Sequence, residues 1–299
     1  MSLSSLKKGS SLDKLKKAVE ASSAGNGGGK NVDDRFWQPE VDAAGNGYAV
    51  IRFLDTPAVD GEDGLPWVQI WSHGFQGPGG WYIENSLTTL GKTDPVSEYN
   101  TVLWNSGVEA NKEIARKQKR KLTYIANVLV ISDAKRPQNE GKVFLFKFGK
   151  KIFDKIKEQL EPQFADETPM NPFDFWKGAN FKVKIRNVEG YRNYDKSEFE
   201  SPAALFDSDD AKIEQVWKSA YSLKDFLKAE NFKSYDELKA KLDKVLGAGG
   251  VAASSAKRID DEQAAAPVVR SAPAKKVTAE EVSVSDDDDM AFFEKLAAE

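Results

Sequence analysis

The sequence lacks cysteine entirely and has only one histidine, His73, among 299 residues. Without cysteine there can be no disulfides, thiolate zinc sites or cysteine nucleophiles. A serine triad would have to use His73, yet the G-x-S-x-G turn that carries a nucleophilic serine is missing. The phosphate-binding loop of P-loop NTPases is missing as well. These absences favour a protein that is not an enzyme.

Long apolar runs are also missing. No stretch approaches the roughly 18 apolar residues that a membrane span requires. The first ten residues, MSLSSLKKGS, lack the apolar segment of a signal peptide. We therefore expect a soluble, intracellular protein. Adjacent acids do occur, at Asp33–Asp34 and Asp209–Asp210. A metal-dependent nuclease built from dispersed acids thus stays open as an alternative.

Charge is distributed unevenly along a chain whose net charge is −4. Residues 279–299 carry eight acidic side chains and one basic side chain, whereas residues 110–160 carry 14 lysines or arginines and five acids. Such asymmetry is typical of a polyanion-binding site combined with an acidic tail.

Composition divides the chain into three parts. Residues 1–30 are predicted to form a basic arm followed by a glycine-rich linker. Residues 31–246 are predicted to form a globular core. Residues 247–299 are rich in Gly, Ala, Ser and Pro and then in acids, which predicts a disordered linker and an acidic tail.

Short β-branched or aromatic runs bounded by turn residues dominate the predicted core. The strands are expected at residues 48–54, 67–71, 122–131, 142–148 and 181–188. Helical spacing predicts helices at 151–160 and 234–246, the second opening with the capping box Ser234-x-x-Glu237. Many short strands with few helices predict a mainly β fold, a small barrel or sandwich with added helices.

Basic and aromatic side chains are interleaved in three segments of the predicted core. These are Lys119, Arg120 and Lys121 before Tyr124; Phe146 and Lys147 before Lys150 and Lys151; and Tyr191 and Tyr194 around Arg192. Cations neutralise phosphates without reading sequence, and aromatic faces stack on unpaired bases at about 1–3 kcal/mol per base. Since a duplex offers no free base faces, the pattern predicts single-strand binding. It leaves DNA or RNA open, and the aromatic residues could instead lie in the core.

Several stretches resemble, in the same order, the single-stranded-DNA-binding, helix-destabilising proteins of T-even-type tailed phages. They are AGNGYAVIRFL, HGF with GGWYIE, KRKLTYIANVLVI, NEGKVFLFKFGKKIFDKI and GANFKVKIRNVEGYRNYD, within residues 42–200. The resemblance implies an OB-fold core with a flexible basic arm for cooperative binding and an acidic tail for replication partners. It also implies a role in DNA replication, recombination and repair in the cytoplasm of the infected bacterial host.

The residue patterns and the resemblance together give the predicted contacts. The predicted DNA-binding residues are Arg52, Trp104, Lys119, Arg120, Lys121, Tyr124, Phe146, Lys147, Lys150, Lys151, Tyr191, Arg192 and Tyr194. The predicted cooperativity residues are Lys7, Lys8, Ser10 and Ser11. The predicted partner-binding residues are Asp286, Asp287, Asp288, Asp289, Phe292 and Phe293.

A structural zinc is the main departure from the family pattern. The resemblance implies one histidine and three cysteine ligands, whose positions fall on His73 and approximately on Ser86, Asp94 and Ser97. Serine and aspartate in place of thiolates do not complete such a tetrahedral site. We therefore expect no zinc and no other cofactor. Packing is expected to hold residues 64–105 together, through the aromatic side chains of Trp67, Trp71, Trp81 and Tyr82.

Overall fold

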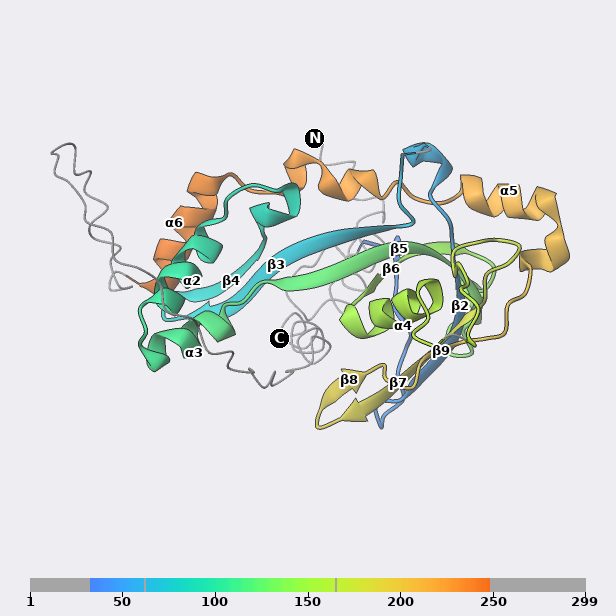
Figure 1. The fold of residues 1–299 in the computed structure, drawn as a ribbon, viewed down its shortest axis with the longest axis horizontal. Coiled ribbons are helices and arrows are strands. Elements are labelled where there is room, and N and C mark those ends of the chain that lie inside the picture. The colour runs from blue at the N-terminus through green and yellow to red at the C-terminus, as the bar shows by residue number, and fades with distance from the viewer. Residues whose placement is uncertain (1–32, 62, 165, 248–299) are drawn as a thin grey trace, which may run out of the picture. The chain divides into compact units, whose positions relative to one another are not determined.

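The computed structural model describes residues 33–247 except 62 and 165 (Figure 1). The predicted cooperativity and partner-binding residues, in the arm and the tail, lie outside the described residues. The described chain forms two compact units. Unit 1 comprises residues 33–68 and 123–225, and unit 2 comprises residues 69–122 and 226–247.

An extended β-sheet forms the centre of unit 1. Its strands are β1 (Phe36–Trp37), β2 (Gly47–Phe53), β5 (Lys121–Ser132), β6 (Val143–Phe148), β7 (Phe181–Val188), β8 (Tyr191–Asn193) and β9 (Glu198–Phe199). The strand order is β1-β6-β5-β2-β7-β8, and β9 also pairs with β7. β1 lies parallel to β6, whereas β2, β5, β6, β7 and their other partners run antiparallel. The prediction of a mainly β fold with added helices is confirmed.

Burial explains why these segments form strands. On β7, Phe181, Val183 and Ile185 are buried while the basic residues between them face outward, which is the alternation of a half-buried strand. Phe53 lies at the centre of an aromatic core, with ring centroids 5.6–6.5 Å from its neighbours. Aromatic rings at these separations stabilise the core beyond the area they bury.

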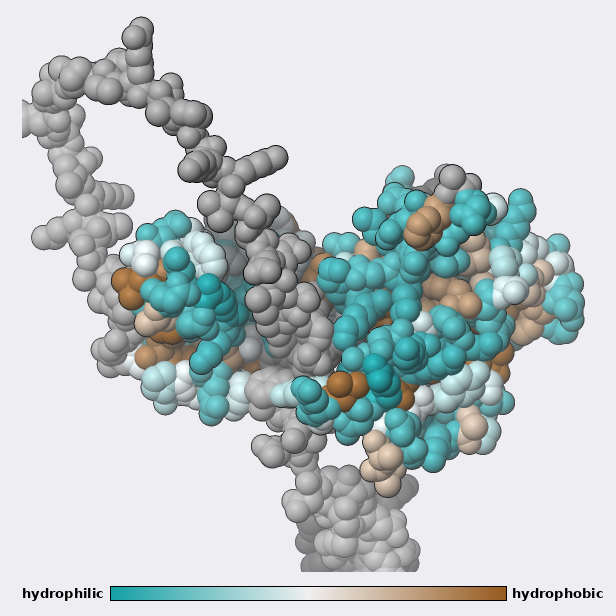
Figure 2. All heavy atoms as spheres, turned by 60° about the horizontal axis from the view of Figure 1, so that its bottom comes forward, coloured by the Kyte–Doolittle hydropathy of each residue, from teal (hydrophilic) through white to brown (hydrophobic). Residues whose placement is uncertain are grey.

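Helices cover parts of unit 1. They are α4 (Lys150–Leu160), α5 (Asp210–Lys218) and the 3-10 turns η1 (Ala58–Asp60), η3 (Pro137–Asn139) and η4 (Leu205–Ser208), with η5 (Lys224–Leu227) at the boundary of the units. α4 buries Ile152 and Ile156 at helical spacing, as predicted. None of the described helices is long and apolar enough to cross a membrane. On the side seen in Figure 2 the described surface is mostly hydrophilic, with hydrophobic residues in small separate patches.

A β-hairpin surrounded by helices forms unit 2. The hairpin is β3 (Trp67–Gly77), whose first two residues belong to unit 1, and β4 (Gly80–Asn85). The helices are α2 (Pro95–Asn105), α3 (Glu109–Lys117), α6 (Tyr235–Leu246) and the 3-10 turns η2 (Leu87–Leu90) and η6 (Ala229–Asn231). Figure 1 shows α2, α3 and α6 gathered around the hairpin. The predicted capping box at the start of α6 is present.

The core of unit 2 joins segments far apart in the sequence. Tyr82 lies in this core as predicted, but Leu238, Leu242 and Val245 of α6 pack with it. Close approach fixes the end of α6 on the hairpin turn: Gly79 N donates to Val245 O at 2.8 Å. A Cβ on Gly79 would lie 1.9 Å from a backbone oxygen of α6, so only glycine fits there. Trp67 packs instead within unit 1, on two phenylalanine rings.

Candidate nucleic-acid interface

The basic cluster Lys119–Lys121 follows the C-terminus of α3 in unit 2. Lys119 is exposed, while Arg120 and Lys121 are half-buried. The guanidinium carbon of Arg120 lies 4.2 Å from the centroid of the Trp71 ring on β3. A cation this close to an indole face is held by a cation–π interaction. The cluster therefore has a defined position relative to β3.

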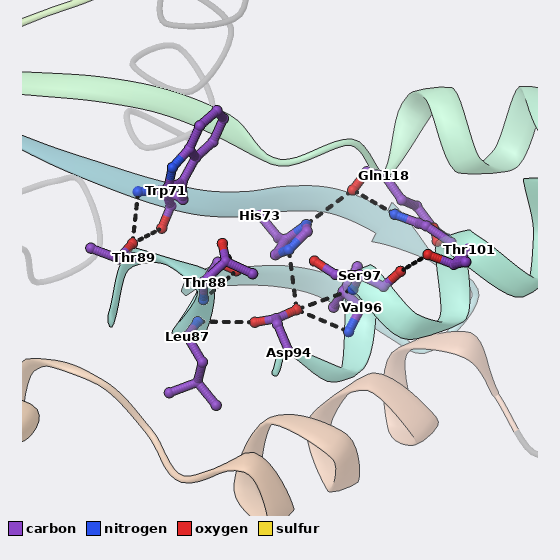
Figure 3. A network of polar contacts seen from close by, with 12 residues as sticks. Trp71, His73, Leu87, Thr88, Thr89, Asp94, Val96, Ser97, Thr101 and Gln118 are labelled. Atoms are coloured by element: carbon purple, nitrogen blue, oxygen red, sulfur yellow. Dashed lines mark hydrogen bonds and ion pairs between the residues drawn. The ribbon is translucent and has the colours of Figure 1, made fainter. Parts of the chain in front are cut away.

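The residue before the cluster, Gln118, is held by a buried polar network (Figure 3). Its carbonyl oxygen lies 3.0 Å from His73 Nδ1 and accepts a hydrogen bond from Asn100 Nδ2 at 3.1 Å. His73 Nε2 lies 3.2 Å from Asp94 Oδ1, within ion-pair distance, although Nε2 makes no hydrogen bond of regular geometry. His73 is 2% exposed and Asp94 is 1% exposed.

Asp94 caps the N-terminus of α2. Its Oδ1 accepts from Val96 N at 3.0 Å and Ser97 N at 3.2 Å, and its Oδ2 accepts from Leu87 N at 3.1 Å. Burial raises the pKa of the Asp94 carboxyl, but the adjacent imidazole of His73, with the Ser97 N–H, lowers that pKa to about 2. The carboxylate is therefore ionised at neutral pH and already has several donors.

This arrangement does not fit the zinc that the family resemblance implies. Both Asp94 oxygens serve as backbone caps, and Ser86 Oγ lies 3.0 Å from Thr88 Oγ1. Neutral hydroxyls beside one carboxylate and one imidazole are a poor substitute for three thiolates. Within the described ranges there is no group of three or more histidine, aspartate or glutamate residues suited to a metal ion.

Trp104 on α2 is a second aromatic residue of unit 2 that lies among cations. Its side chain is 48% exposed. Lys112 Nζ and Arg116 Cζ on α3 lie 5.9 Å and 5.4 Å from its ring centroid. The structure thus pairs this predicted contact residue with cations of α3.

In unit 1, Tyr124 on β5 stacks on Phe153 of α4, with ring centroids 3.9 Å apart. Tyr124 is only 5% exposed, whereas Phe153, which sequence reasoning missed, is half-buried and more accessible. Phe153 follows the predicted Lys150 and Lys151 in the first turns of α4. No side chain caps that N-terminus and no acid lies in its first turn. Lys150 Nζ lies 2.6 Å from Asp154 Oδ2, so the positive end of the helix and Lys151 are the features that favour an anion such as phosphate here.

Three predicted contact residues of unit 1 are buried, namely Tyr124, Arg52 and Phe146, and their assignment as contacts is corrected. Arg52 is 1% exposed, and its Nη2 donates to the backbone oxygens of Asp174 at 2.8 Å and Ala203 at 3.0 Å. Burial lowers the pKa of its guanidinium to about 10. Phe146 is also 1% exposed and packs edge-on against Trp37. In this structure none of the three side chains offers surface to a nucleic acid, because all are buried.

The remaining predicted residues lie at the surface of unit 1. Lys147 is exposed on β6, on the face opposite its buried neighbours. Tyr191 on β8 is 38% exposed, and Arg192 and Tyr194 are half-buried. The hairpin turn before Tyr191 includes Glu189 and Gly190, both at positive φ. The structure thus places an aromatic and basic group at one hairpin.

The outward-facing cations of β7 are all paired with acids. Lys184 Nζ lies 2.7 Å from Glu198 Oε1, and Lys182 Nζ lies 3.1 Å from a carboxylate oxygen of Glu200. Arg186 pairs with Asp195 in the same way. We call these three pairs the β7 ion-pair row.

The sequence is similar to those of known DNA-binding proteins. Residues 45–246 match the family described as gp32 DNA-binding-protein-like. The chain is 40% identical over 253 residues to a single-stranded DNA-binding protein of Enterobacteria phage T2, covering 81% of this chain and 82% of that protein. It is also 40% identical over 245 residues to one of Enterobacteria phage T4, covering 79% of each. A third, of Enterobacteria phage RB70, is 42% identical over 112 residues, covering 36% of this chain and 90% of that protein.

Proposed function

Because the chain belongs to the gp32-like family of DNA-binding proteins, we propose that it binds single-stranded DNA without sequence preference and without catalysing a reaction. The observation that carries the proposal is the basic cluster Lys119–Lys121, seated on β3 through the contact of Arg120 with Trp71. We place its work in phage DNA replication, recombination and repair in the cytoplasm of an infected bacterium, and we assign an OB-fold to its core.

Phosphate neutralisation and base stacking supply the binding energy. In unit 2 the cluster contacts phosphates and Trp104 offers an exposed ring. In unit 1 the α4 N-terminus contacts phosphate and Phe153 offers an accessible ring face, with the aromatic and basic residues of the β7–β8 hairpin as further contacts. Each unit thus has both chemistries that single strands require.

Titration with poly-dT, followed by quenching of tryptophan fluorescence at several salt concentrations, tests the proposal. We expect saturable binding that weakens linearly in log salt, since bound phosphates release counterions. Stronger competition by oligo-U than by oligo-dT would favour the RNA-binding alternative. Release of acid-soluble nucleotides in the presence of magnesium would favour the nuclease. Absence of salt-dependent binding to either polymer would refute the proposal.

The two chain ends act in self-association and partner recruitment in this proposal. Lys7, Lys8, Ser10 and Ser11 contact a neighbouring protomer on the strand, and Asp286–Asp289 with Phe292 and Phe293 contact replication proteins. Deleting residues 1–20 should weaken binding to long poly-dT far more than binding to an oligomer that fits one protomer. Equal losses on both lengths would contradict the arm's role.

Deleting residues 279–299 should raise the affinity for single-stranded DNA at low salt, because the acidic tail competes for the same cations. Changing Phe292 and Phe293 to alanine in the full-length chain should leave DNA binding unchanged but reduce recovery of phage replication proteins from an infected-cell extract. Equal recovery with and without these rings would contradict partner contact.

The protein works without zinc or another cofactor in this proposal. Support comes from Asp94, whose two oxygens already accept backbone hydrogen bonds in the place where the resemblance implies a thiolate. One zinc per chain by elemental analysis would overturn this part of the proposal.

A further inference from the structure

We propose that His73 and Asp94 are positioning residues for DNA binding, which fix the backbone from which the basic cluster Lys119–Lys121 projects. The inference rests on the proposed function, because it assigns a task to residues that lie behind the cluster. Neither side chain is exposed enough to contact a strand itself.

His73 contacts the residue that precedes the cluster. The imidazole Nδ1 lies 3.0 Å from the carbonyl oxygen of Gln118, which is 45 residues away in the sequence. Asn100 Nδ2 donates to the same oxygen. The peptide that links Gln118 to Lys119 is therefore held at its oxygen by β3 and by α2. This contact sets where the chain leaves α3 and where the three cations begin.

Asp94 lies against the other side of the imidazole, with its Oδ1 3.2 Å from His73 Nε2. The carboxylate accepts three backbone hydrogen bonds, one from Leu87 in η2 and two from the first turn of α2. Figure 3 shows these bonds converging on one side chain, with His73 between it and Gln118. A carboxylate held by three backbone donors has little freedom to move. His73 consequently links a rigid junction of β3, η2 and α2 to the chain at Gln118.

A second side chain of β3, Trp71, contacts the cluster itself. Trp71 lies two residues before His73, on the same face of β3. Its backbone is held on both sides. Trp71 N donates a hydrogen bond to Thr89 Oγ1 at 2.8 Å, and Ser86 N donates one to Trp71 O at 2.8 Å. The guanidinium carbon of Arg120 lies 4.2 Å from the centroid of the Trp71 ring. Strand β3 thus holds the backbone before the cluster through one side chain and a cation within the cluster through another.

A role in folding alone does not explain this layout. A buried imidazole–carboxylate pair has a desolvation cost that well-packed apolar residues would avoid. The pair is instead directed at a carbonyl one residue from the cations. Binding groups held in place before the ligand arrives lose less entropy when it binds, so a fixed cluster binds phosphates more strongly than a mobile one.

Two substitutions of His73 separate the ends of this link. His73→Asn keeps a donor near the Nδ1 position, toward Gln118, and His73→Gln keeps a donor near the Nε2 position, toward Asp94. Both leave an amide of similar polarity in the same buried place. Leu242→Ala serves as the control, because it destabilises the core of unit 2 from α6 without removing a hydrogen-bonding group of the network.

The readout is the slope of log K against log salt for full-length protein on poly-dT, at a temperature where every variant is folded by circular dichroism. We expect His73→Gln and His73→Asn each to flatten the slope by about 0.7 or more, equivalent to at least one phosphate contact, because each breaks one end of the link. Leu242→Ala should keep the wild-type slope, even where it lowers the melting temperature as much.

Equal slopes for wild type, His73→Gln and His73→Asn would overturn the inference. So would a Leu242→Ala slope as shallow as that of His73→Gln, because loss of stability alone would then explain the effect. A wild-type protein without salt-dependent binding would refute the proposed function itself. Should His73→Gln not fold, Asp94→Asn at the other end of the link is measured in its place, with the same two readings.

Discussion

Replacing Lys119, Arg120 and Lys121 together with alanine should lower single-stranded DNA affinity by about 100-fold at low salt, at roughly 1 kcal/mol per contact. The slope of log K against log salt should become shallower by about 2, because each lost phosphate contact lowers it by about 0.7 for a single strand. Fluorescence titration with poly-dT at four or more salt concentrations measures both quantities.

The β7 ion-pair row supplies the matched control. Replacing Lys182, Lys184 and Arg186 with alanine removes the same net charge, but from cations that already have acidic partners. Its effect on the slope should be small once salt screens charges beyond about 10 Å. Equal effects of the two triple substitutions would show that net charge, and not the cluster, governs binding. An unchanged slope for the first triple would mean that the cluster points away from the strand.

Arg52→Met should lower the free energy of unfolding by about 3 kcal/mol or more. The substitution keeps an aliphatic side chain in the core but removes the donor shared by the carbonyls of Asp174 and Ala203. A hydrogen bond from a charged donor contributes about 1.5–3 kcal/mol, and the substitution removes both of these bonds. Urea denaturation followed by circular dichroism measures the change.

Arg186→Met is the control for this second substitution. Arg186 is an exposed cation with one acidic partner, and such surface pairs contribute about 0–1 kcal/mol. If Arg52→Met kept the wild-type unfolding free energy while losing affinity for poly-dT, Arg52 would be a DNA contact after all. The placement of its guanidinium in the core would then be wrong.

The sheet was predictable because its signals are local. Strands β5 and β7 are single runs whose apolar and β-branched residues can be read directly, and the capping box of α6 lies within four residues. Helix α3 was missed because Ala115 is its only buried residue, so it has no apolar stripe. Helix α5 buries little more and was missed for the same reason.

The candidate site was predictable only in part. The run of cations at Lys119–Lys121 is visible in the sequence, but its support by His73 and Trp71 depends on contacts about 45 residues apart. Arg52 was misassigned because a charged residue within an apolar strand carries no sign of the carbonyls that surround it. In β6, both faces of the strand are apolar, so the pattern could not tell a stacking ring from a core ring such as Phe146.

The β7 ion-pair row has a consequence for the route of a bound strand. A phosphate that approached Lys182, Lys184 or Arg186 would have to displace a carboxylate already in place, and would meet the negative charge of that carboxylate as well. This side of the sheet therefore favours polyanion binding less than its number of cations indicates. The lysine and arginine residues of the β7 ion-pair row therefore add to the positive charge of the protein without adding phosphate contacts.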